Sequence, residues 1–336
     1  MLIRILRGKY PAGQTVWLVL MLLLPLPALL VHGLAIVQPE DSSVLYKGIC
    51  RVLESFPLWG KMMVWYLFIL FLLYQGSVLW TIMAPGRRAR LVPMISGAMI
   101  LFLLPQNNLF HPVLPALGFL LPGVISLMKA SVSQRTRVYL FNAGLLISVA
   151  SLLYYGFVLL LPFILIALLV LRLYDRTFFA VLLTGMGLPW LYIIVIQWIA
   201  NISFDPGGYG VVGMYISNFL YMSTYLAAIM GTAEIMQVIL LILLLIVVLP
   251  FSMKGIDQQI IATRQQYKVL YWLLLPSFLL LLVSGGMFFP ALTLISVLMV
   301  PLMCDFLLQT KKPKAVNAAL WIVLLSIAAF RIAGLQ

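Results

Sequence analysis

The stretch MMVWYLFILFLLYQGSVLWTIM, residues 62–83, contains no charged residue and is followed by Arg87, Arg88 and Arg90. At a rise of about 1.5 Å per residue, a helix of this length crosses the roughly 30 Å hydrocarbon core of a bilayer. Similar apolar runs recur along the 336-residue chain, which is 64% hydrophobic and only 9% charged. Soluble domains carry about 25% charged residues. The sequence therefore predicts an all-α, polytopic membrane protein and excludes a water-soluble globular one.

The apolar runs predict a bundle of about eleven membrane-spanning helices, with the N-terminus in the cytoplasm. Three of these spans are short: Leu91–Leu104 and the two halves of a hairpin within Val138–Leu171, which turns at Tyr154-Tyr155-Gly156. Short apolar segments are tolerated in a membrane when they pack against protein. The other expected spans are Thr15–Val37, which Pro25 and Pro27 should break softly, Met62–Met83, about Leu109–Met128, Phe178–Ala200, Ala233–Phe251, Val269–Val283, Met287–Leu308 and Ala315–Ala333.

The formal net charge of +13 comes from 21 Lys and Arg residues against 8 Asp and Glu residues. The basic residues stand in short clusters between the apolar runs. With a cytoplasmic N-terminus every cluster falls on the cytoplasmic side, as the positive-inside rule requires. This arrangement accounts for the charge without a nucleic-acid partner and makes the lipid bilayer the expected partner. The clusters are Arg87–Arg90, Lys129–Arg137, Arg172–Arg176, Lys254–Lys268 and Lys311–Lys314.

The sequence shows no internal repeat and no linker, so residues 1–336 are expected to form a single membrane domain. The basic stretch Arg4–Lys9 also fits the start of a signal peptide, but the run Thr15–Val37 is long enough to be an uncleaved first span. Residues 201–232 are expected to form an outer loop. Within it, the tyrosine-rich stretch 211–230 suits an interfacial or re-entrant helix better than a span.

The eight acidic residues are expected near the two membrane faces, with none in the middle of a span. Proton- or sodium-coupled carriers usually hold an ionisable group at mid-membrane depth, so this distribution disfavours coupled transport. The histidines, cysteines and acids lack the spacing of a metal motif, and no cofactor is predicted. The expected outer acids are Glu40, Asp41, Glu54, Asp205 and Glu234, and the expected inner acids are Asp175, Asp257 and Asp305.

The first outer loop carries the most informative pattern. Its start, Pro39-Glu40-Asp41-Ser42, is typical of a helix N-terminus with Asp41 or Ser42 as the N-cap. An apolar stripe then recurs at helical spacing with charged residues off it, which predicts an amphipathic helix over residues 42–57 on the outer membrane face. The acids either cap this helix or form a carboxylate pair beside a membrane-surface groove. The stripe is Leu45, Ile49, Val52, Leu53 and Phe56, and the charged residues are Lys47, Arg51 and Glu54.

Adjacent acids directly after a first span, followed by an interfacial helix, resemble the first outer loop of the GT-C membrane glycosyltransferases. Those enzymes take a sugar from a polyprenyl-phosphate carrier, and one loop carboxylate acts as base toward the acceptor. The resemblance implies that Asp41 or Glu40 is the catalytic base and that Arg51 or Lys47 faces phosphate. The order here is Glu-Asp where many relatives have Asp-Glu, which leaves open which acid acts.

Three further polar residues, His111, Asp205 and Arg331, are candidate substrate-binding residues on the outer side. The alternative for His111 is a histidine at a helix end near the interface. Arg331 is the basic residue that the last span carries outward, against the positive-inside rule. It fits either the outer lipid headgroups or the phosphate of a polyprenyl carrier.

Other stretches resemble an uncharacterised family of bacterial inner-membrane proteins found mainly in Bacteroidota: Arg4–Tyr10, Phe141–Tyr155 and Arg172–Trp190. This resemblance implies a location in the inner membrane and no particular activity. Three classes of function stay open. They are an outer-face enzyme of cell-envelope biogenesis acting on polyprenyl-linked glycans, a non-enzymatic assembly protein that binds other envelope proteins, and a transporter or lipid flippase. The acidic loop favours the enzyme.

Overall fold

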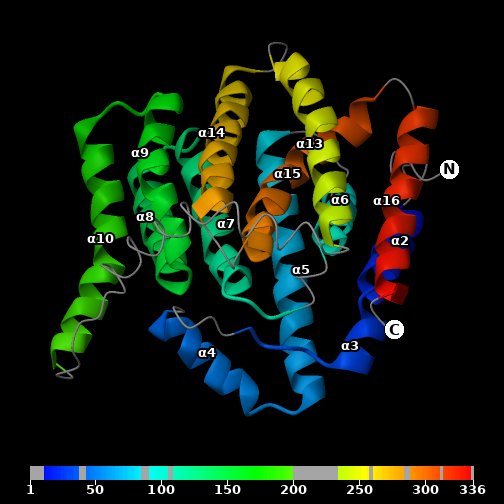
Figure 1. The fold of residues 1–336 in the computed structure, drawn as a ribbon. Helices are drawn as coiled ribbons and strands as arrows, with labels where there is room; N and C mark the ends of the chain where they lie inside the picture. Colours follow the sequence, from blue (N-terminus) through cyan, green and yellow to red (C-terminus); the bar gives the residue numbers. More distant parts are fainter. Residues whose placement is uncertain are drawn as a thin grey trace.

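The structure, a computed structural model, describes residues 11–37, 43–84, 91–104, 109–199, 234–256, 260–283, 288–310 and 313–333. These residues form an all-α bundle with α10 and α16 at opposite edges (Figure 1). The helices are α2 (Pro11–Leu23), α3 (Leu26–His32), α4 (Val44–Glu54), α5 (Leu58–Met83), α6 (Leu91–Leu103), α7 (Val113–Ala130), α8 (Thr136–Leu153), the 3₁₀ helix η2 (Tyr155–Leu159), α9 (Leu160–Val170), α10 (Arg176–Ile199), α13 (Glu234–Ile256), α14 (Ile261–Val283), α15 (Phe288–Gln309) and α16 (Pro313–Ala333).

Five of the described helices are long and apolar enough to cross a membrane. They are α5, α7, α8, the segment Arg176–Ile196 of α10 and the segment Ala291–Gln309 of α15. Shorter apolar helices accompany them, including α6 and the unit formed by η2 and α9. The chain is therefore a helical, multi-pass membrane protein, and the number of about eleven spans stays a prediction.

Most expected helices lie close to their predicted positions. The helices α5, α10, α13, α15 and α16 match the predicted runs within a few residues at each end. The break predicted at Tyr154-Tyr155-Gly156 is also confirmed, because α8 ends at Leu153 and the chain passes through η2 into α9. The length of each apolar run predicts the bounds of these helices, because the thickness of the hydrocarbon core sets how long an apolar helix must be.

The first span was predicted over Thr15–Val37 with a soft break at Pro25 and Pro27; the break is confirmed, and the predicted end at Val37 is wrong. The helix breaks after Leu23, α3 ends at His32, and residues 33–37 are not helical. Pro25 and Pro27 account for the break, because proline removes a backbone donor and clashes with the preceding turn. The chain therefore leaves the helix earlier than its hydropathy indicates.

Two other helix starts differ from the prediction. The helix expected from about Leu109 begins at Val113, because Phe110 pairs with another segment and Pro112 is the N-cap of α7. The helix expected from Val269 begins eight residues earlier, at Ile261, so that Arg264 and Lys268 lie on α14 rather than in a loop. Hydropathy misses this first part of α14 because its polar residues Thr263 and Gln266 are buried against protein.

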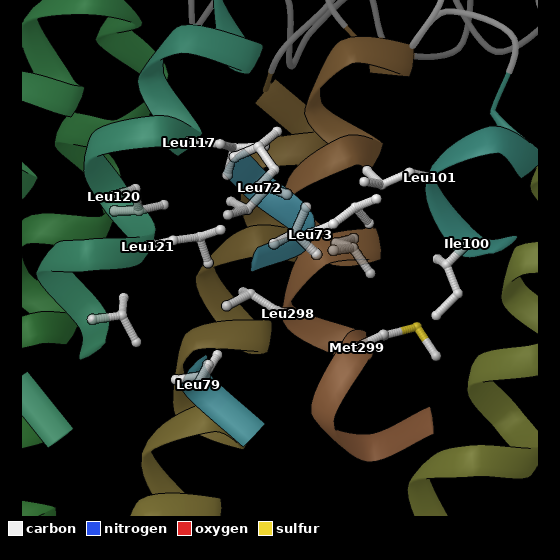
Figure 2. Close-up of a cluster of buried hydrophobic side chains, with 14 of the residues drawn as sticks. Leu72, Leu73, Leu79, Ile100, Leu101, Leu117, Leu120, Leu121, Leu298 and Met299 are labelled. Atoms are coloured by element: carbon white, nitrogen blue, oxygen red, sulfur yellow. The ribbon is translucent and has the colours of Figure 1, made fainter. Parts of the chain in front are cut away.

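The buried core lies where α5, α6, α7 and α15 meet. Most of the membrane-spanning part of α15 is buried, so this helix is the centre of the bundle. The short helix α6 is buried on all sides from Ile95 to Leu103, which agrees with the expectation that it needs protein around it. In hydrocarbon such helices are held by close packing rather than by the exclusion of water. Figure 2 shows this cluster, with Leu72, Leu73, Leu79, Ile100, Leu101, Leu117, Leu120, Leu121, Leu298 and Met299 labelled.

Two hydrogen bonds between helices show which helix ends lie at the same end of the bundle. At one end, the Ser43 hydroxyl, directly before α4, donates to the carbonyl oxygen of Leu153 at the end of α8 (3.0 Å). At the other end, the indole N–H of Trp80, near the end of α5, donates to Asp305 near the end of α15 (3.2 Å). We call these the α4 end and the Asp305 end. In Figure 1, α4 lies at the bottom, and the end of α9, the start of α10, the end of α13 and the start of α14 lie at the top.

The basic clusters of the described chain gather at the Asp305 end. Helix α8 finishes beside α4, so its first residues lie at the far end, and Tyr267 of α14 bonds to Asp305. A common end for the clusters is what the positive-inside pattern predicts. The residues concerned are Lys129, Arg135, Arg137, Arg172, Arg176, Arg264, Lys268 and Lys314.

Helices α8 and α10 cross at two glycines. A Cβ atom on Gly144 would lie 2.4 Å from the carbonyl oxygen of Leu182, and one on Gly185 would lie 2.5 Å from that of Phe141. The Ser148 hydroxyl donates across the same crossing to the carbonyl oxygen of Met186 (2.6 Å). Small residues allow two membrane helices to approach at backbone distance. The two glycines are therefore required by the packing.

We expect Gly144→Ala and Gly185→Ala each to lower the free energy of unfolding by about 1–3 kcal/mol, since the added methyl group meets backbone that cannot yield without separating the helices. The measurement is thermal unfolding of the purified protein in a mild detergent. Gly187→Ala is the matched control, because a Cβ there meets nothing within 4 Å. Equal melting temperatures for all three variants would contradict the packing requirement.

Candidate functional site

At the α4 end, the chain that leaves α3 forms a short extended segment. Gly33 turns the chain with φ of 72°, a left-handed conformation that glycine adopts without strain. The N–H of Val37 donates to the carbonyl oxygen of Phe110 (2.9 Å), and the N–H of Phe110 donates to that of Ala35 (2.9 Å). This pairing satisfies backbone groups that no helix satisfies. It also holds residue 37 beside the chain that enters α7.

Tyr46 of α4 closes over this pairing. Its hydroxyl lies 2.8 Å from the carbonyl oxygen of Val37 and 3.0 Å from that of Phe110, and it shares one proton between them. Its ring stacks on the ring of Phe110, with centroids 6.2 Å apart and planes at 9°. Burial raises the pKa of the Tyr46 hydroxyl, so the group stays a neutral donor. Tyr46 thus joins three segments of the chain.

Ser43 is the N-cap of α4, and the prediction of Asp41 or Ser42 is wrong. The backbone of Ser43 is extended, and its Oγ accepts from the N–H of Tyr46 (3.1 Å). The same hydroxyl donates to the carbonyl oxygen of Leu153. Helix α4 starts directly after Ser43, because this residue caps the helix and its hydroxyl also bonds to the end of α8. A capping role for the acids is therefore not needed.

Helix α4 has three faces, which follow from a rotation of about 100° per residue. One face, Tyr46, Cys50 and Leu53, is buried against the bundle. The apolar residues Leu45 and Val52 point outward and are exposed, as is Phe56 directly after the helix. The sequence-based stripe therefore combined parts of two faces, because hydropathy does not distinguish contact with protein from contact with lipid. A helix with one outward apolar face suits a membrane surface.

The charged residues form the third face of α4, on the side away from its outward apolar face. Lys47, Arg51 and Glu54 are all exposed there. By the helical rotation Lys47 and Glu54 lie about 140–180° from Leu45 and Val52, and Arg51 lies about 100–120° from them, so a helix that rests its apolar face on lipid presents Lys47 and Glu54 to water and Arg51 to the side. Lys47 and Arg51 are in consequence placed where an anionic headgroup or phosphate could reach them.

His111 lies directly after Phe110 and before the N-cap of α7. The side chain is fully buried, and this burial lowers the pKa of the imidazole to about 3. The ring is therefore neutral at physiological pH. Its position before a helix agrees with the helix-end alternative from the sequence. Its burial means that a substrate would meet it only inside the protein.

Other predicted site residues are only partly placed. Glu40, Asp41 and Asp205 lie outside the described residues, as does the predicted outer loop 201–232. Arg331 belongs to the last turns of α16, which starts at the Asp305 end and runs toward the α4 end. Among the described residues, no group of three His, Cys, Asp or Glu side chains could hold a metal ion. The structure does bring together the two flanks of the acidic loop and His111.

A second polar cluster lies at the Asp305 end, and sequence reasoning gave it no role. Asp305 is 5% exposed, and its two carboxylate oxygens accept from the Trp80 indole and from the Tyr267 hydroxyl. The available signal was an acid inside the apolar run from Leu302 to Leu308. This carboxylate fastens α5 and α14 to the central helix.

Tyr46→Phe should lower the free energy of unfolding by about 1–2 kcal/mol, because the ring stack stays while the carbonyl oxygen of Val37 loses its donor. Thermal unfolding in detergent measures this loss. Tyr74→Phe on α5 is the control, since the Tyr74 side chain is 57% exposed. Equal losses in the two variants would show that the Tyr46 hydroxyl is not needed.

Acid should destabilise the protein through His111. The pKa of the His111 imidazole is near 6.5 in the unfolded chain and about 3 in the folded protein. Between these pH values the unfolded state binds more protons, so the free energy of unfolding falls as the pH falls. From pH 7 to pH 4 the loss from this one group is about 3 kcal/mol. His111→Gln should show a smaller fall in melting temperature between pH 7 and pH 4 than the wild type. A fall of the same size would contradict the buried, neutral state.

Comparison with known proteins gives no match for this chain. No protein-family model, no curated protein and no solved structure is similar to it. The chemistry of the α4 end therefore has to be inferred from its own residues and geometry.

Proposed function

We propose that this chain is a multi-pass protein of the bacterial inner membrane that acts in cell-envelope biogenesis as a GT-C-like glycosyltransferase. Its substrate is a sugar carried on a polyprenyl phosphate, and the reaction takes place at the α4 end, on the outer membrane face. Asp41 or Glu40 accepts the proton of an acceptor hydroxyl as that oxygen bonds to the sugar carbon. The bond from this carbon to the phosphate breaks, and the polyprenyl phosphate leaves.

The observation that carries this proposal is the fixing of both flanks of the acidic loop. Val37 is held by Phe110 and Tyr46, and Ser43 is held by Leu153. A general base must lie within hydrogen-bond reach of the proton that it removes. Asp41 stands two residues before Ser43, and covalent reach limits it to about 7 Å from that anchor. Such a loop suits a base because its position is limited from both sides.

The charged face of α4 supports the same reaction. Lys47 and Arg51 are both exposed on α4 and lie outside its outward apolar surface. Basic side chains at a membrane surface attract phosphate, and guanidinium binds it with two parallel hydrogen bonds. These residues are therefore suited to hold the phosphate of the carrier while an acid of the loop acts at the sugar.

The distribution of charge between the two ends supports the outer location. Lys and Arg residues of several helices share the Asp305 end. The positive-inside rule assigns such an end to the cytoplasm. The α4 end then faces the opposite compartment, where polyprenyl-linked sugars are consumed by GT-C enzymes.

The variants Asp41→Asn and Glu40→Gln test the catalytic role of the acidic loop separately from its effect on folding. Loss of the general base should lower transfer by about 100-fold or more, since general-base catalysis contributes about 10²–10⁴ in rate. We expect at least one of the two variants to lose the envelope glycan that the wild-type gene restores in a deletion strain. Its melting temperature in detergent should stay that of the wild type.

Glu54→Gln is the matched control, because Glu54 is an exposed acid on α4 outside the loop. It should restore the glycan fully. Wild-type glycans in both loop variants, each present at normal level in the membrane, would overturn the proposed activity.

A further inference from the structure

Three arginines lie at the Asp305 end, where α8 starts and the chain turns from α9 into α10, at the edge of the bundle that α10 forms (Figure 1). Arg137 belongs to the first turn of α8, Arg172 lies in the turn after α9, and Arg176 is the first residue of α10. All three side chains are exposed. We call this group of three the basic corner.

The acid in this corner, Asp175, balances only part of the positive charge. Its two carboxylate oxygens accept from the N–H (3.0 Å) and from the hydroxyl (2.7 Å) of Thr177. These hydrogen bonds, and with them the nearby charge of Arg137, lower the pKa of the Asp175 carboxyl. The charge of Arg137 thus acts on the residue directly before α10. Three guanidinium groups against one carboxylate leave the corner positive.

Arg172 occupies a backbone position that favours glycine. The N–H of Leu173 donates to the carbonyl oxygen of Leu168 (3.0 Å), and that of Arg172 donates to Leu169 (3.1 Å), which is the Schellman pattern that ends a helix. The φ of Arg172 is 60°, and no other non-glycine residue of the described chain has a positive φ. A side chain makes this left-handed conformation costly. An arginine that gives up stability here points to a use for its guanidinium group.

An exposed apolar stripe runs along α10 from Arg176. At 100° of rotation per residue, Leu183 and Ile194 lie within about 20° of Arg176 on the helix surface. They are 50% and 47% exposed. Only 22% of the apolar window of α10 is buried, so in a multi-pass membrane protein this stripe contacts lipid chains. The Arg176 guanidinium therefore stands at the end of a lipid-facing surface.

We propose that the basic corner binds the phosphate of an anionic phospholipid from the leaflet at the Asp305 end, with an acyl chain along the apolar stripe of α10. Guanidinium groups bind phosphate with parallel, charge-assisted hydrogen bonds. A soluble acidic partner would leave the stripe uncovered, and a zwitterionic lipid would leave the positive charge unbalanced. An anionic phospholipid matches both surfaces. The site lies at the opposite end from the acidic loop and does not depend on the reaction proposed there.

The first test measures headgroup preference. The full-length protein is reconstituted in nanodiscs of equal parts phosphatidylglycerol and phosphatidylethanolamine, and retained lipid is identified by native mass spectrometry after transfer to detergent. We expect the wild type to retain phosphatidylglycerol in preference to phosphatidylethanolamine. Arg176→Gln should lower this preference about fivefold, the contribution of one basic residue near a membrane surface.

Lys314→Gln is the matched control, because it removes one exposed positive charge at the same end but on α16, at the opposite edge of the bundle. It should leave the preference unchanged. Equal losses in Arg176→Gln and Lys314→Gln would show a general effect of surface charge and would overturn the site. A wild type without headgroup preference would overturn it as well.

Arg172→Gly separates lipid binding from stability. Glycine adopts the left-handed conformation without strain, so the melting temperature in detergent should rise. Retention of phosphatidylglycerol should nevertheless fall about fivefold, because one guanidinium group is lost. A loss of lipid from a more stable protein does not come from unfolding. Wild-type retention in this variant would contradict the proposed contact with phosphate.

A photoreactive benzoylphenylalanine at Leu183 identifies what covers the stripe. The same residue at Val247 of α13, which is 49% exposed, is the control for ordinary lipid contact. We expect the ratio of crosslinked phosphatidylglycerol to phosphatidylethanolamine to be higher at Leu183 than at Val247. Equal ratios at the two positions, or crosslinks from Leu183 to a second copy of the protein, would overturn the proposal.

Discussion

Backbone N–H and C=O groups must find partners within the protein wherever hydrocarbon surrounds the chain. Helices meet this requirement by themselves, and the extended residues 33–37 cannot. Their pairing with Phe110, closed by the Tyr46 hydroxyl, solves the problem at the α4 end. The position of α4, the start of α7 and the flanks of the acidic loop all depend on this one junction.

The membrane helices could be predicted from sequence because bilayer thickness dictates the length of an apolar run. The partners of each segment could not be predicted, and the wrong starts of α7 and α14 lie where such a partner decides. Phe110 delays the start of α7 because its backbone serves residues 33–37. Thr263 and Gln266 belong to the first part of α14 because their side chains face protein. A hydropathy average over neighbouring residues does not show which way each side chain points.

The candidate sites also show that sequence does not predict which residues the fold brings together. The acidic loop stands out in the sequence because two adjacent acids are rare in so apolar a chain, and its role stays a prediction. The role of Asp305 was missed because its donors, Trp80 and Tyr267, are far away in sequence, and only the fold brings them together. The two ends of the bundle thus differ in character: one holds a capped surface helix, and the other holds a buried carboxylate among basic residues.

The bond between Ser43 and Leu153 joins residues 110 positions apart. A ribosome adds about 5–20 residues per second, so about 5–20 s pass between the synthesis of α4 and that of its last anchor. During this interval the Ser43 hydroxyl has no acceptor on α8, and α4 is held only through Tyr46, first by Val37 and then by Phe110. The α4 end therefore reaches its final arrangement only after the last residues of α8 are made, although α4 itself is encoded early in the gene.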